Sequence, residues 1–177
     1  MAIYVPTISG YEPFYIQRDG DNTATNILST YGVVVKDSGY PMGRKAKTPY
    51  KNDWKDRDGD DEWNTVINYE AFNYDLECAM FVRVTQQVSE QTARQQLATG
   101  IKTFEDFIKN GEFKFWSGWH RFGFQKARID EFHAPSSDKF AVVGDFVRVF
   151  FSFSVKVNDP TTAMTYNSSQ NKIVAAS

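Results

Sequence analysis

The chain has 177 residues, of which 41% are hydrophobic and 16% aromatic. This length and composition fit one folded domain with a substantial core and exclude a chain that is disordered throughout. The formal net charge is only −2, so no overall positive field draws the chain to nucleic acid or anionic lipid, and we expect no specific nucleic acid and no membrane insertion.

Signals of regular structure are weak before residue 70. A short apolar run, "YGVVVKDSGY", is followed by the basic, loop-like stretch "PMGRKAKTPYKNDW". The last residues are mainly Ser, Thr, Asn and Ala, which bury little apolar surface. We therefore divide the chain into an N-terminal arm (1–26), a single β-rich domain (27–160) and a flexible C-terminal tail (161–177).

The acidic stretch "DWKDRDGDDEW" (53–63) raises the question of a calcium loop. Such a loop needs oxygen ligands at its first and last positions and a glycine in the middle. If Gly59 takes the glycine position, Trp54 and Thr65 fall at the two end positions, where neither supplies a carboxylate. We interpret the stretch as a hairpin turn or a loop between subunits, with Asp-Gly turn chemistry.

Two elements with clear periodicity follow. In "FNYDLECAMFVRV" (72–84) apolar residues occupy every second position, which predicts a long strand with one buried face. In "SEQTARQQLATGIKTFEDFIKNG" (89–111) apolar residues recur every three or four positions, which predicts a helix. Ser89 is the expected N-cap of this helix, and Asn110-Gly111 is the expected stop.

The next segment, "EFKFWSGWHRFGFQKARIDEF" (112–132), predicts two strands joined by a turn at Ser117-Gly118, with a bulge or bend near Gln125. A last alternating strand, "FVRVFFSFSVKVNDP", is expected to end at Asn158-Asp159-Pro160. The resulting fold class is mainly β with one α-helix (α+β), a β-sandwich or partial barrel with the helix packed against it.

Candidate chemistry is sparse. Trp116, Trp119 and His120 could form an aromatic surface that stacks on sugars or bases, although core packing explains most of the same pattern. Cys78 lies on the apolar side of its strand, where a thiol behaves as a small hydrophobe. The two histidines have no metal-ligand spacing. We expect no enzyme, no catalytic residue, no cofactor and no bound metal.

The order of these motifs resembles the N-terminal domain of distal tail proteins of long-tailed bacteriophages, in the version found in phages and prophages of Bacteroides-type bacteria. The resemblance covers residues 27–160 and is carried by "TYGVVVKDSGY", "KNDWKDRDGDDEW", the long strand, the helix ending in "IKNGEFKFW", the hairpin and the final "KVNDP". It implies a tail-tube-like fold and a ring, commonly a hexamer, between the tail tube and the host-recognition apparatus or baseplate.

The resemblance also implies partners and a location. The partners would be further copies of the chain and proteins of the tail tube and tail tip, in a virion assembled in the bacterial cytoplasm. A tail-terminator or tail-tube protein stays open as an alternative, as does a carbohydrate- or calcium-binding module. We expect an assembly loop in which the acids of one copy meet the bases of its neighbour. The residues are Asp56, Asp58, Asp60, Asp61, Arg44, Lys45 and Lys47.

Overall fold

The structure is a computed structural model, and it describes residues 11–39, 45–47, 51–53, 60–62 and 69–176. Two of the described elements are α-helices and one is a 3-10 turn, while the rest are strands. The helices and the turn are α1 (Ile27–Tyr31), α2 (Glu90–Ile108) and η1 (Ser137–Lys139). The strands are β1 (Phe14–Arg18), β2 (Thr25–Asn26), β3 (Val34–Gly39), β4 (Lys51–Asp53), β5 (Asp60–Glu62), β6 (Phe72–Arg83), β7 (Phe113–Ser117), β8 (Phe122–His133), β9 (Ala141–Val143), β10 (Phe146–Asn167) and β11 (Lys172–Ala175).

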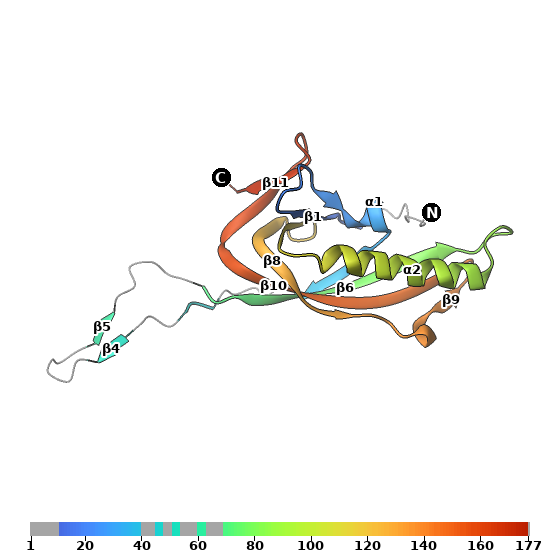
Figure 1. The fold of residues 1–177 in the computed structure, drawn as a ribbon, viewed down its shortest axis with the longest axis horizontal. Coiled ribbons are helices and arrows are strands. Elements are labelled where there is room, and N and C mark those ends of the chain that lie inside the picture. Colours follow the sequence, from blue (N-terminus) through green and yellow to red (C-terminus); the bar gives the residue numbers. More distant parts are fainter. Residues whose placement is uncertain (1–10, 40–44, 48–50, 54–59, 63–68, 177) are drawn as a thin grey trace.

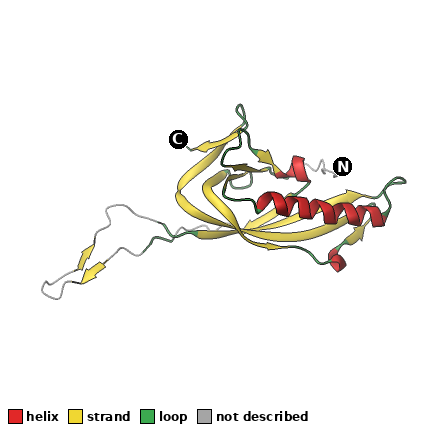
Figure 2. Cartoon of the chain, viewed as in Figure 1, coloured by secondary structure: helices red, strands yellow, loops and turns green. Residues whose placement is uncertain are grey.

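In the described part of the chain, one nine-stranded antiparallel sheet dominates the fold. Its order is β2-β1-β7-β8-β10-β6-β3, with β9 and β11 also pairing β10. The sheet curls strongly, and α2 lies along its concave side (Figures 1 and 2). The predicted class, mainly β with a helix packed against the sheet, is confirmed, and the curled sheet has the form of a partial barrel.

Strands β6 and β10 form the centre of the sheet. They pair without a break from Phe146 with Arg83 to Val157 with Phe72, so that the apolar sides of both predicted strands face the same way. Phe153 is 1% exposed, and its ring lies 5.7 Å from that of Phe104 in α2. The alternation read from the sequence therefore fixes which face of the sheet meets the helix.

Helix α2 begins where the sequence predicts. Ser89 is its N-cap, and the Ser89 side chain accepts a hydrogen bond from the backbone N–H of Thr92. The helix ends at Ile108 with Lys109 as the C-cap, and Gly111 follows at φ 83°. Gly100 is buried against the sheet side of the helix, which explains a residue that is otherwise unfavourable in a helix interior.

The β7–β8 hairpin contains the predicted irregularity. Phe113 pairs with Ala127 and Phe115 with Phe124, so β8 has one more residue than β7 between these pairs. Lys126 takes a φ of 51°, which marks the bulge beside Gln125. The bulge reverses the side-chain parity along β8, and this lets both halves of the strand direct apolar residues into the core.

The C-terminal prediction was wrong. Strand β10 does not end at Asn158-Asp159-Pro160, and residues 161–175 are not a flexible tail, because β10 continues to Asn167 and β11 pairs with its end. The Asp-Pro sequence instead makes a corner, with a shift in the pairing to β8 between Asp159 and Ala163. Figure 1 shows β10 bending sharply before it meets β11.

The N-terminal boundary also differs from the expectation. Residues 14–26 are not a separate arm, since β1 pairs with β7 along its length and with β2. The buried Gln17 side chain accepts a hydrogen bond of 2.7 Å from the backbone N–H of Ile173 in β11. A bond of 2.7 Å from the N–H of Ala24 to the carbonyl of Asn171 adds to this contact. Both ends of the chain thus help to build the curled part of the sheet.

Candidate assembly surface

The aromatic residues of the β7–β8 hairpin lie in two separate groups. Trp116 packs with Tyr15 and Tyr166, at ring distances of 6.1 and 5.7 Å, beside a small buried cluster. Trp119 is 46% exposed, and its Nε1 donates to the Val35 carbonyl of β3 at 3.4 Å. Trp116 and Trp119 therefore do not form the single platform that the sequence suggested.

The two groups have different local partners. His120 lies against Phe122, with ring centroids 5.5 Å apart, and approaches Tyr74 at 6.4 Å. Tyr15 stacks on Tyr166 at 3.9 Å, and burial, followed by the contact with Tyr166, raises the pKa of Tyr15 to about 12. These rings pack on one another and on the core, as aromatic side chains on paired strands usually do.

The described residues on either side of the predicted turn of the acidic stretch pair as two short strands. Strands β4 and β5 pair antiparallel from Lys51 with Glu62 to Asp53 with Asp60, and they form a sheet of their own. Asp60 and Asp61 are residues of β5. Asp56, Asp58 and Arg44 lie outside the described residues.

The structure describes two of the three basic residues that are predicted to contact the acids of a neighbouring copy. Lys45 and Lys47 are both exposed, and Lys45 Nζ lies 3.1 Å from the Glu70 carboxylate of the same chain. The Ala46 backbone forms an isolated bridge with Tyr69, so this short segment is held beside the start of β6. The pairing of these bases with acids of a neighbouring copy stays a prediction.

Cys78 is buried, as its place in the alternating pattern predicts. The residue is 1% exposed, and burial, with a smaller effect of the Glu77 charge, raises the pKa of its thiol. The thiolate form is therefore disfavoured at neutral pH, which makes Cys78 a poor nucleophile. Its physical role is that of a small apolar side chain in the core.

An exposed apolar surface that the sequence did not reveal lies on β9. Val142 and Val143 are each 46% exposed, and we call these two residues the β9 patch. Strand β9 pairs with β10 on one side, and no described strand pairs with its other side. The segment "AVVGD" is too short for a periodicity test, so only the fold reveals it as an exposed edge.

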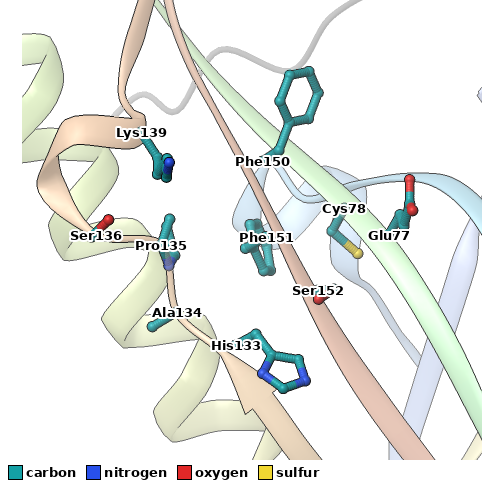
Figure 3. A pocket seen from close by; sticks show the side chains of 10 residues that line it. All are labelled: Glu77, Cys78, His133, Ala134, Pro135, Ser136, Lys139, Phe150, Phe151 and Ser152. Atoms are coloured by element: carbon teal, nitrogen blue, oxygen red, sulfur yellow. The ribbon is translucent and has the colours of Figure 1, made fainter.

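Two hollows lie next to each other where β8 leaves β10. The larger, about 650 Å³, is bounded by the segment from Ala134 to Lys139 and by Phe150 on β10 (Figure 3). The smaller, about 290 Å³, is lined by residues of β6, β8 and β10 that are all polar except Phe153. His133 and Ser152 line both hollows.

Two other kinds of site have no candidate in the described ranges. No group of three or more His, Cys, Asp or Glu residues among them is placed to hold a metal ion. No described helix is long and apolar enough to cross a membrane.

Comparison with known proteins found a likeness in structure. No protein-family model and no curated protein matches the chain. The crystal structure of the Dit (gp 19.1) protein of phage SPP1, described as a paradigm of the hub adsorption apparatus in Gram-positive infecting phages, is similar with a TM-score of 0.49 and 12% identity. The likeness covers 86% of this chain and 52% of the SPP1 protein, so the chain spans about half of that protein's length.

Proposed function

We propose that the chain is a non-enzymatic structural component of a phage or prophage tail, of the distal tail or baseplate hub type, that self-assembles into a ring. The order of motifs in the sequence supports this proposal. The long strand, the capped helix and the bulged hairpin of that resemblance form as expected, and the closing strand forms but continues to Asn167. The Bacteroides-type origin and the hexameric ring are parts of the same proposal.

The observation that carries self-assembly is the β9 patch. Val142 and Val143 expose nearly half of their surfaces on a short edge strand. An edge strand presents unpaired backbone groups to other chains, and the two half-exposed valines add apolar surface that a partner would bury. A second copy of the chain would cover the patch, and a repeated head-to-tail contact gives a ring when its rotation closes.

The decisive experiment compares the wild type with a Val142→Lys/Val143→Lys variant. We expect the wild type to form a discrete oligomer by light scattering and rings in electron micrographs, and the variant to be monomeric. A Gln91→Lys/Gln95→Lys variant adds the same charge on the exposed side of α2 and should assemble normally. A wild type that stays monomeric at high concentration, and forms no rings with tail-tube partners, would refute the proposal.

The acidic hairpin loop is a second proposed contact in the same assembly. Its acids would meet Arg44, Lys45 and Lys47 of a neighbouring copy, so assembly should weaken as salt screens the charges. Reversing the charge of Asp58 and Asp60 should weaken assembly and reduce its salt dependence. If both quantities stay as in the wild type, the loop has no such role.

A further inference from the structure

Two rows of polar side chains cross three neighbouring strands on the convex face of the sheet. The pairing of β10 with β8 and β6 aligns Glu131, Ser154 and Asp75 in one row. The adjacent row consists of His133, Ser152 and Glu77. These residues alternate with core residues such as Phe153, so their side chains point away from α2.

Residues of both rows line a polar hollow with a buried hydroxyl in its floor. Ser154 is 7% exposed, lines the hollow of about 290 Å³, and its Oγ has no hydrogen-bond partner. The side chain of Glu131 on one wall is 65% exposed. Ser154 is small and lies between the longer side chains of Asp75 and Glu131, so the three residues form a trough. The Ser154 hydroxyl at its bottom still lacks a hydrogen-bond partner.

The spacing of the acids favours an organic cation over a metal ion. Asp75 and Glu131 are on strands two places apart, so their backbones are separated by about 10 Å. Calcium needs six to eight oxygens within about 2.6 Å, and no described cluster is arranged as a metal site. A guanidinium is planar and carries several N–H donors, so it can contact a carboxylate and the Ser154 hydroxyl together.

The larger hollow continues the trough with apolar walls. It shares His133 and Ser152 with the acidic part and extends to Phe150, which is 47% exposed, and to Pro135 (Figure 3). Phe150 is two to four residues along β10 from the serines, a distance of about 7 to 13 Å. An extended segment lying along β10 could therefore place a cation and an apolar side chain in the two parts.

The geometry points to a peptide-binding trough, and we propose that it receives an extended segment of a protein partner. An arginine of that segment lies between Asp75 and Glu131 and donates to Ser154 Oγ. An apolar side chain roughly three positions away lies against Phe150 and Pro135. At the far end of the acidic part, Arg128 and Lys156 pair side by side and limit how far a cation extends in that direction.

Fluorescence anisotropy with labelled peptides tests this inference directly. The probe is a fluorescein-labelled peptide of sequence GSRGSFGS, with GSQGSFGS and GSRGSSGS as matched peptides. We expect saturable binding of the first peptide, weakened roughly tenfold by either replacement and weakened again by salt. Equal binding of the glutamine peptide, or no binding of the first peptide at millimolar protein, would overturn the inference.

Variants of the protein locate the binding. Asp75→Asn/Glu131→Gln should weaken binding of the arginine peptide roughly tenfold. The control variant Asp19→Asn/Glu12→Gln removes two exposed acids that line neither hollow, and it should bind the peptide as the wild type does. Ser154→Ala removes the unpartnered hydroxyl and should weaken binding while the protein stays folded by circular dichroism. Unchanged affinity in the acid variant would place the peptide elsewhere and refute the trough.

Two further measurements distinguish the peptide trough from a metal site and from the ring contact. Titration calorimetry with calcium chloride should show no binding. Calcium binding that disappears in the Asp75→Asn/Glu131→Gln variant, without peptide binding, would make the trough a metal site instead. The Val142→Lys/Val143→Lys variant should still bind the peptide, so failure of ring assembly and failure of the trough are distinguishable.

Discussion

The corner of β10 at Asp159 provides a sharp test of how this fold is stabilised. The Asp159 carboxylate accepts hydrogen bonds from the N–H groups of Thr161 and Thr162, at 3.1 and 3.3 Å, and from both threonine hydroxyls. It also accepts a bond of 2.9 Å from Gln125 Nε2, across the β8 bulge. One carboxylate therefore satisfies the donors that the corner removes from the strand ladder.

Replacing this residue should cost a large part of the stability of the chain. A hydrogen bond to a charged group contributes about 1.5–3 kcal/mol, less where water replaces it. Because part of the corner is exposed, we expect Asp159→Ala to lower the free energy of unfolding by about 3 kcal/mol, out of a total of about 10 kcal/mol. Asp159→Asn keeps one acceptor oxygen and should cost about 2 kcal/mol.

The same contacts make this contribution depend on pH. The hydrogen bond from Thr161, with those from Gln125 and the backbone, holds the pKa of Asp159 well below its usual range. The stabilisation is therefore complete above the unfolded pKa of about 4 and is lost as pH falls toward the folded pKa. Below about pH 4 the difference in free energy of unfolding between the wild type and Asp159→Asn should become smaller.

Urea unfolding monitored by tryptophan fluorescence, from pH 7 down to pH 3, measures both effects. The exposed Asp19→Asn change is the matched control and should shift the midpoint little. A variant at Asp159 whose free energy of unfolding stays within about 0.5 kcal/mol of the wild type at neutral pH would refute the role of the corner.

Three further predictions concern the core and the helix. Gly123→Ala should unfold the hairpin or lower the free energy of unfolding in urea by more than about 3 kcal/mol, because a Cβ there would lie 1.8 Å from the Phe115 carbonyl oxygen. A variant as stable as the wild type would contradict this backbone geometry. Ser89→Ala removes the N-cap of α2 and should cost about 1 kcal/mol by thermal or urea unfolding, whereas no loss would mean that the cap is replaced by water. The buried Cys78 thiol should react with a disulfide reagent only as fast as the protein opens, and rapid labelling of the native protein would show that it is accessible.

Local sequence patterns predicted the central elements well. The alternation in β6 and β10 and the caps of α2 depend on neighbouring residues, so their physical causes are visible in the sequence. The Asp159-Pro160 signal predicted the end of the strand, whereas the structure shows a shift in the pairing with β8 and a strand that continues. It could not show that the chain re-enters the sheet, because that depends on Gln125, which is 34 residues away in sequence.

The candidate site was less predictable for the same reason. Trp116, Trp119 and His120 are close in sequence, but the β7–β8 turn directs them to different neighbours. The β9 patch consists of ordinary valines whose exposure depends on an edge that sequence does not mark. Assembly surfaces are defined by what remains uncovered after folding, and this is a property of the whole sheet.

The sequence by itself determined a β-rich chain with one long helix, the inward faces of its main strands and a buried cysteine, because side-chain periodicity and burial are linked locally. Only the tertiary structure decided that both ends of the chain join the sheet, through contacts such as Gln17 with Ile173. Only the tertiary structure, likewise, brought Asp75, Ser154 and Glu131 into one row. Strand register joins residues far apart in sequence, and no local pattern specifies it.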